Sequence, residues 1–244
     1  MKKYKLTNET IEYKGKKLYR IKALIDFGNV KKGARGGFVE KEENLSMSGN
    51  AWVSGDALVC GTAKVYGAAQ VCGAAKVCGD AKVCGDALVC GGAQVYGTAK
   101  VYGAAQVYGT AKVYGAAKVC GDALVHGAAK VCGDAQVYGT AKVCGDALVC
   151  GGAQVYGTAK VCGDALVDKS INYAVIKGFG TCYRPTTFFR CQDKTVKVSC
   201  GCFLGTIDEF RNQVKNTRGG KIAKEYLMIA DLMELHFSED GYDD

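Results

Sequence analysis

Proline, histidine and tryptophan are scarce in this chain of 244 residues, which has one Pro, two His and one Trp. The single proline excludes collagen and proline-rich linkers, although the 34 glycines are about twice the usual share. No apolar run approaches about 18 residues, so we expect no transmembrane helix, and the basic N-terminus lacks the apolar segment of a signal peptide. Fourteen cysteines in a chain that is not exported predict free thiols in a reducing cytoplasm.

An unbroken hexapeptide repeat, G-x-A-x-V-x, runs from Gly49 to Asp168, which is 120 residues or 20 hexads. The alternation of Ala and Val with variable residues is typical of a β-strand with one apolar face. A glycine at every sixth residue provides a corner where a positive φ is not penalised, whereas in a helix each would cost about 1 kcal/mol. Strands of about four residues cannot bury an apolar face alone, so the repeat predicts stacked coils about 4.8 Å apart.

The repeat alone leaves two coil sizes open, two hexads or three. With three hexads, the fourth positions of one face contain only long polar side chains: Lys64, Lys82, Lys100, Lys118, Gln136 and Gln154. An 18-residue duplication that begins at Cys84 and again at Cys144 favours two, because 60 is a multiple of 12 and not of 18. We favour three hexads, which give a triangular coil that Ala and Val fill well.

Read from valine, the repeat V-x-G-x-A-x resembles that of left-handed parallel β-helix proteins. The resemblance covers about half of the chain and implies a mainly β fold, a single-stranded, left-handed triangular β-solenoid of the trimeric hexapeptide-repeat superfamily. More narrowly, residues 18–57 resemble the opening of hexapeptide-repeat proteins of the phage and prophage type, which are often named transferases on their fold alone. This resemblance implies a location in the cytoplasm of a bacterial host cell.

The flanks of the repeat predict three segments: a β-rich cap over residues 1–48, the β-helix over 49–168 and an α+β module over 169–244. A hairpin around Gly15 is expected in the cap. The last segment predicts a ββαα module, with strands at 186–191 and 194–200, a capping box at Thr206 to Glu209, and a second helix over about 222–236. The second helix has an apolar face of Ile222, Tyr226, Ile229, Leu232, Met233 and Leu235.

The positive charge of the chain is concentrated in the cap, which carries +6 of the formal net charge of +8. Such an excess suits contact with nucleic acid or another anionic surface, and a solvated cationic face is the simpler interpretation. The candidate anion-binding residues of the cap are Lys14, Lys16, Lys17, Arg20, Lys31, Lys32 and Arg35.

Ten of the cysteines occupy the sixth position of a hexad, which faces outward by alternation. A triangular coil stacks four pairs directly, Cys60/Cys78, Cys72/Cys90, Cys132/Cys150 and Cys144/Cys162. We expect these to stay free thiols, because parallel side chains in register aim poorly for a disulfide. Metal binding through stacked thiolates is a weaker alternative. The other four, Cys182, Cys191, Cys200 and Cys202, are weak zinc-ligand candidates, and packing within strands is the simpler interpretation.

The function favoured by these patterns is a non-enzymatic scaffold or binding protein of phage type that needs no cofactor and contacts no membrane. The column Lys64, Lys82, Lys100 and Lys118 suits an anionic polymer, a host protein or self-association. The main alternative, by analogy of fold, is a trimeric acyltransferase that uses acyl-CoA, with His126 as a weak candidate base. The second alternative is binding of nucleic acid or a host protein through the cap or the C-terminal module.

Overall fold

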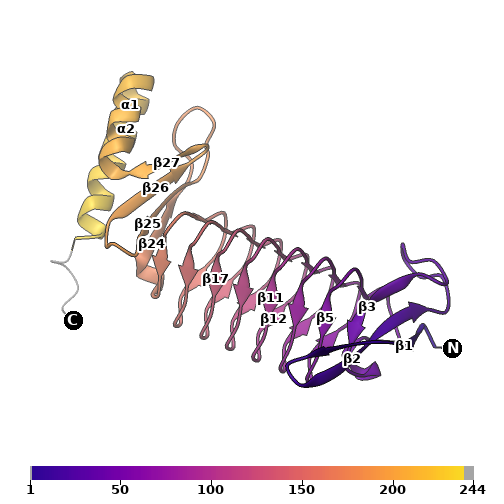
Figure 1. Ribbon diagram of the computed structural model, residues 1–244. Helices are drawn as coiled ribbons and strands as arrows, with labels where there is room; N and C mark the ends of the chain where they lie inside the picture. Colours follow the sequence, from indigo (N-terminus) through magenta and orange to yellow (C-terminus); the bar gives the residue numbers. More distant parts are fainter. Residues whose placement is uncertain (1, 239–244) are drawn as a thin grey trace.

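A computed structural model of the protein describes residues 2–238 and shows a long parallel β-solenoid closed at each end by a small separate structure (Figure 1). Each hexad contributes its fourth and fifth residues to a short strand, and each strand pairs with the strands 18 residues away. Three hexads therefore make one coil, which confirms the triangular solenoid. The 60-residue duplication shifts the repeat by one face, since Leu88 and Leu148 lie in different sheets. The handedness stays a prediction.

The coil strands form three parallel sheets, and we name the third of them the lysine face. The first sheet consists of β5 (Leu58–Val59), β8 (Lys76–Val77), β11 (Gln94–Val95), β14 (Lys112–Val113), β17 (Lys130–Val131), β20 (Leu148–Val149) and β23 (Leu166–Val167). The second consists of β4 (Trp52–Val53), β7 (Gln70–Val71), β10 (Leu88–Val89), β13 (Gln106–Val107), β16 (Leu124–Val125), β19 (Lys142–Val143) and β22 (Lys160–Val161). The lysine face consists of β6 (Lys64–Val65), β9 (Lys82–Val83), β12 (Lys100–Val101), β15 (Lys118–Val119), β18 (Gln136–Val137) and β21 (Gln154–Val155).

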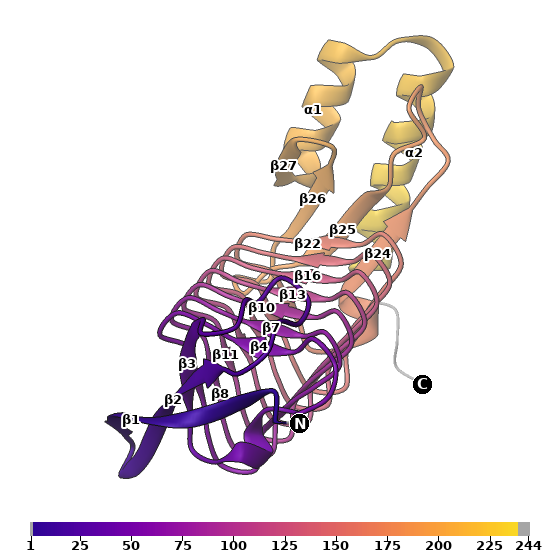
Figure 2. The same ribbon diagram turned by 90° about the vertical axis from the view of Figure 1, so that its right-hand side faces the viewer.

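The interior of the solenoid is built from the alanine and valine of every hexad, which are almost completely buried. Backbone hydrogen bonds join each coil to the next, for example from Lys82 N to Ala99 O at 2.9 Å and from Tyr102 N to Val119 O at 3.0 Å. In Figure 2 the coils lie nested one behind another without an inserted loop. The variable fourth and sixth positions of the hexads therefore supply the outer surface, and this surface repeats every 18 residues.

Glycine is required at the coil corners for two reasons. All 20 repeat glycines have positive φ, between 60° and 74°. The corners of successive coils also approach closely: a Cβ placed on Gly103 would lie 3.0 Å from Gly121 N. Any other residue would strain its own backbone and, at all corners but the last ones, press on the next coil, so the strict glycine period follows from the stacking.

The N-terminal cap is a three-stranded antiparallel sheet that continues directly into the first solenoid sheet. Its strands are β1 (Tyr4–Tyr13), β2 (Lys16–Ala23) and β3 (Arg35–Val39), followed by the 3₁₀ turn η1 (Glu42–Asn44). The expected hairpin around Gly15 is confirmed, and Lys14 and Gly15 both adopt positive φ in its two-residue turn. Strand β3 then pairs in parallel with β5, so the cap covers the exposed edge of the first coil.

Buried polar groups close the first coil beneath the cap. The Lys3 ammonium donates to Ala51 O at 2.9 Å, and the Asn44 amide donates to Ala63 O at 2.9 Å. Trp52 is 4% exposed, and its ring packs edge-on against Tyr4 and Phe27. The carbonyl groups that would point into an open end therefore have partners, as buried backbone requires.

The C-terminal module contains four strands, two more than the expected ββαα arrangement. The strands β24 (Tyr173–Ile176), β25 (Thr186–Arg190), β26 (Val196–Cys200) and β27 (Phe203–Thr206) form one antiparallel sheet, preceded by η2 (Ser170–Asn172) and followed by α1 (Ile207–Thr217) and α2 (Gly220–His236). The two helices lie side by side beyond the last coil (Figure 2). The predicted capping box is confirmed, because Thr206 Oγ1 accepts from Glu209 N at 3.2 Å and Thr206 N donates to the Glu209 carboxylate at 2.7 Å.

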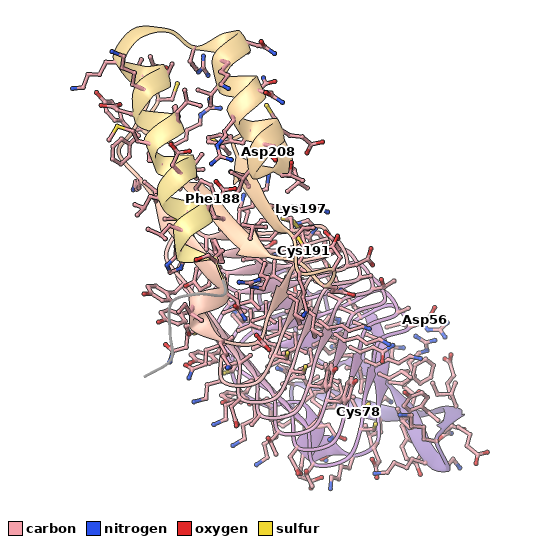
Figure 3. The ribbon with its side chains drawn as sticks, turned by 90° about the vertical axis from the view of Figure 1, so that its left-hand side faces the viewer. Asp56, Cys78, Phe188, Cys191, Lys197 and Asp208 are labelled. Carbon is pink, nitrogen blue, oxygen red and sulfur yellow. A yellow bond between two sulfur atoms is a disulfide. The ribbon has the colours of Figure 1, made fainter. Side chains whose placement is uncertain are left out.

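The apolar face of α2 is narrower than the sequence indicates. Tyr226, Ile229 and Met233 are buried against the sheet, whereas Leu232 and Leu235 are 55% and 72% exposed. Leu232 and Leu235 are thus apolar residues of α2 that lie outside the core. At the other side of the module, Lys197 Nζ lies 2.7 Å from a carboxylate oxygen of Asp164 in the last coil, and Figure 3 shows Lys197 at this junction.

Candidate functional site

The four lysines of the lysine face follow one another in register along the solenoid. Lys64 pairs with Lys82, Lys82 with Lys100, and Lys100 with Lys118 in successive parallel strands. Because the adjacent valine of each strand points inward, each lysine points outward, and all but the half-buried Lys118 are exposed. At about 4.8 Å between strands, the column extends for about 14 Å.

No carboxylate forms an ion pair with this column among residues 2–238, although Glu43 lines the same shallow opening as Lys64 and Lys82. The ion pairs in that range belong to the cap, to the terminal module and to their junctions with the solenoid. Neighbouring ammonium groups in water repel each other by about 1 kcal/mol at the spacing of the coils. The lysine column is therefore a line of positive charge without an ion pair in the described part of the chain.

A row of aromatic side chains lies at the corner that follows the lysine strands. Its tyrosines are Tyr66, Tyr102, Tyr138 and Tyr156. Tyr66 is 40% exposed, Tyr102 is 36% exposed and Tyr156 is 51% exposed. A hydrogen bond with the Cys120 thiol, together with burial, raises the pKa of Tyr102 to about 12, so this phenol stays neutral at physiological pH. Flat aromatic rings beside cations are the combination that binds the rings and charges of a linear polyanion.

The candidate cations of the cap are mostly paired already. Lys16 binds Glu40 at 2.9 Å, Arg20 and Arg35 share Glu9, and Lys31 binds Asp26 at 3.0 Å. Lys14 and Lys17 instead lie over the rings of Tyr13 and Tyr19, and Lys32 makes no ion pair among residues 2–238. The large formal charge of the cap is therefore a weaker field than the sequence suggests, because its carboxylates lie among its cations.

His126 lies in the outer corner column of the second sheet, between Tyr108 and Cys144. Its ring is stacked on that of Tyr108, with centroids 4.9 Å apart and planes within 4°. Burial lowers the pKa of His126, and the charges of Lys142 and Lys160 act in the same direction. No carboxylate hydrogen-bonds its ring among the residues that the structure describes. The arrangement places the imidazole as a half-buried, neutral aromatic ring without a group that would orient it as a base.

The four terminal cysteines divide between two places. Cys182, Cys200 and Cys202 line a pocket of about 370 Å³ between the module sheet and α1, together with Arg184 and Arg218. Cys191 lies at the opposite end of β25, buried against the last coil (Figure 3). The structure thus does not bring the four sulfurs together as one ligand set.

Cys191 instead adjoins two carboxylates, and the ligand atoms of Asp164, Cys191 and Asp193 lie within 4.8 Å of one another. Burial raises the pKa of Cys191 to about 12, so the sulfur is a protonated thiol. Asp164 binds Lys197, and Asp193 accepts from Thr195 Oγ1 at 2.6 Å. These contacts occupy the groups that a cation would need, and the cluster serves to fasten the module to the solenoid.

The cysteine pairs of the solenoid contain one departure from the expected free thiols. Cys144 and Cys162 are joined by a disulfide, so the expectation is wrong for this pair. Parallel side chains in register can therefore close a disulfide at this corner, where the two Cα atoms lie 4.5 Å apart. The other eight cysteines of the solenoid and the four cysteines of the terminal module are free thiols.

Within the described residues, neither helix is long and apolar enough to cross a membrane. In comparisons with known proteins, no family model and no curated protein matches the chain. The lysine face and its tyrosine row are therefore interpreted from their own geometry.

Proposed function

We propose that this protein is a non-enzymatic β-solenoid of the phage type that binds a linear polyanion along the lysine face. The observation that carries the proposal is the unpaired column of Lys64, Lys82, Lys100 and Lys118, held in register by parallel strand pairing. A rigid row of cations matches a ligand whose anionic groups also recur along a line. The bacterial cytoplasm expected from the resemblance is part of the same proposal.

The solenoid favours a long ligand over a small one. A small substrate needs a concave pocket with a few convergent polar groups, whereas the coil faces repeat the same side chains at each step. The tyrosine row beside the lysines adds apolar contact for the rings of a polymer, and the counterions released by the polymer supply the main driving force. The cap and the terminal module keep the two ends of the stack from pairing with further strands.

Two variants with the same change in net charge test the proposal. One is the triple substitution Lys64→Gln, Lys82→Gln and Lys100→Gln on the lysine face. The control changes Lys112 and Lys130 of the first sheet and Lys142 of the second sheet to glutamine. Binding of a fluorescent single-stranded oligonucleotide and of a sulfated polysaccharide is measured for each by anisotropy. We expect the first variant to lose binding of the preferred polymer and the control to keep it, whereas equal loss in both would show that net charge alone is responsible.

The acyltransferase alternative is tested by the same full-length protein. Binding of acetyl-CoA that disappears in a His126→Ala variant would overturn the non-enzymatic proposal. We expect no such dependence, because the His126 ring is stacked on Tyr108 and has no carboxylate to orient it within the described residues. A Tyr108→Phe variant, which keeps the stack, serves as the matched control.

A further inference from the structure

A second feature, separate from the lysine face, lies where the cap meets the first coils. Cys60 and Cys78 occupy the same corner of successive coils, and their sulfur atoms lie 3.0 Å apart. Cys60 is 4% exposed, and Cys78 is half-buried. The Cys60 N–H donates to Val77 O at 3.0 Å, which fixes the register of the two cysteines. The pair is thus a dithiol whose geometry is set by the backbone.

The Cys144–Cys162 disulfide occurs in the same backbone setting. The Cys144 N–H donates to Val161 O at 3.0 Å, as the Cys60 N–H does to Val77 O. One coil step at an outer corner therefore accommodates a disulfide between stacked cysteines. It follows that Cys60 and Cys78 can close a disulfide without a change of register.

A cationic pocket lies beside the Cys60–Cys78 pair. The opening, of about 540 Å³, is lined by both cysteines and by Lys14, Lys16 and Lys76. The β1–β2 hairpin brings Lys14 and Lys16 over the coil, while Lys76 belongs to β8 and lies 5.0 Å from the Tyr13 ring. Only Lys16 is paired with a carboxylate among the described residues. The pocket therefore has an excess of positive charge next to two sulfurs.

The same surroundings favour a thiolate in the pair. The hydrogen bond between the two sulfurs and the charges of Lys16 and Lys14 lower the pKa of Cys60, and together they outweigh burial and Glu40, which raise it. Thiolates are the nucleophiles in thiol–disulfide exchange. A thiolate, a second thiol within contact and a cationic pocket are the three elements that exchange with an anionic disulfide requires.

We propose that Cys60 and Cys78 form a redox-active dithiol that reacts with an anionic low-molecular-mass disulfide of the glutathione type. The thiolate of the pair attacks one sulfur of glutathione disulfide, the disulfide bond breaks, and one glutathione thiolate leaves and takes a proton from water. The second cysteine loses its proton to water and attacks the mixed disulfide, so that the Cys60–Cys78 bond forms and the second glutathione leaves as a thiolate, which takes a proton from water. Two electrons pass from the cysteines to glutathione disulfide, which becomes two glutathione thiols.

The chain contains internal controls for this reaction. Cys84 and Cys120 occupy the corner column of the lysine face, where the residues one coil away are Tyr66, Tyr102 and Tyr138. Neither of these cysteines has a stacked sulfur. The full-length protein is reduced, freed of reductant and exposed to glutathione disulfide, and free thiols are then alkylated and mapped by mass spectrometry. We expect a Cys60–Cys78 disulfide while Cys84 and Cys120 remain alkylated, and a stable mixed disulfide or free thiols at the pair would overturn the proposal.

The role of the pocket is tested by its charge. We expect the double variant Lys14→Gln and Lys76→Gln to react with glutathione disulfide about tenfold more slowly, which is the scale of a local electrostatic effect on association. Its reaction with uncharged 2-hydroxyethyl disulfide should slow much less, because the loss of the Lys14 charge then acts only through the pKa of Cys60. This second reaction also shows that the pair is intact. A Lys130→Gln variant, with the change far along the same sheet, is the control. Unchanged rates with glutathione disulfide, or equal losses with both reagents, would contradict an anion-binding pocket.

Discussion

The coil corners allow a prediction in which backbone strain and crowding are separated. Gly103 has a φ of 70°, and its added Cβ would lie 3.0 Å from Gly121 N. Gly157 has a φ of 66°, but nothing lies within 4 Å of its added Cβ. Gly152 has neither a positive φ nor a close neighbour. Alanine at Gly103 therefore tests crowding together with strain, alanine at Gly157 tests strain alone, and alanine at Gly152 tests neither.

The expected changes in the free energy of unfolding follow from these differences. Gly157→Ala should cost about 1–2 kcal/mol, the strain of an L-residue in the left-handed region. Gly103→Ala should cost about 2–4 kcal/mol, because the backbone of the next coil must also move. Gly152→Ala should stabilise by about 0.4–1 kcal/mol, since alanine restricts the unfolded chain.

Urea unfolding followed by circular dichroism measures all three variants against the parent. Because a solenoid need not unfold in one step, the midpoints of each transition are compared as well as the total signal. An order of Gly152→Ala, parent, Gly157→Ala and Gly103→Ala from most to least stable supports the stacking argument. Equal midpoints for Gly103→Ala and Gly152→Ala would refute it.

Three further predictions concern the ends of the molecule and its disulfide. Burial lowers the pKa of Lys3 to about 8, so the unfolded chain binds more protons than the folded one between about pH 8 and 10.5. Stability should therefore rise with pH in this window. Urea midpoints measured across the window should show the rise in the parent and not in Lys3→Met. Cys144→Ser should lower the free energy of unfolding by about 3 kcal/mol without reductant, the loop-closure value for 18 residues, and have little effect with reductant present. Thr206→Ala should cost about 1 kcal/mol in thermal unfolding through loss of the α1 cap, whereas Thr206→Ser should be nearly neutral.

The repeat made most of the fold predictable because each hexad combines an apolar alternation with a glycine corner. The coil size also followed from side chains, since only the three-hexad period keeps Lys64 to Lys118 on one face. The missed strands had weak local signals. Tyr173–Ile176 follows the repeat almost directly, and Phe203–Thr206 contains Gly205 and ends at a helix cap. Their strand character comes from pairing with β25 and β26, which is a tertiary effect.

The sequence predicts which residues form the basic cap and the lysine face, but not how far carboxylates neutralise their positive charge. The sequence identifies the cap as the most basic segment, yet the hairpin and the following loop bring Glu9 and Glu40 against its cations. By contrast, the repeat places no carboxylate within the lysine strands. The lysine column therefore carries fewer positive charges than the cap, but fewer of them are paired with carboxylates. The Cys60–Cys78 pocket needed the cap hairpin to be placed over the coil, and no spacing in the sequence reveals that contact.

The salt dependence of polyanion binding tests the central claim most directly. If all four lysines of the lysine face contact a single-stranded polyanion, the logarithm of the association constant should fall against the logarithm of salt concentration with a slope of about −2.8. The slope should move to about −0.7 when Lys64, Lys82 and Lys100 are changed to glutamine, and stay near −2.8 when Lys112, Lys130 and Lys142 are changed instead. A slope that is the same in the parent and the first variant would contradict binding along the lysine face.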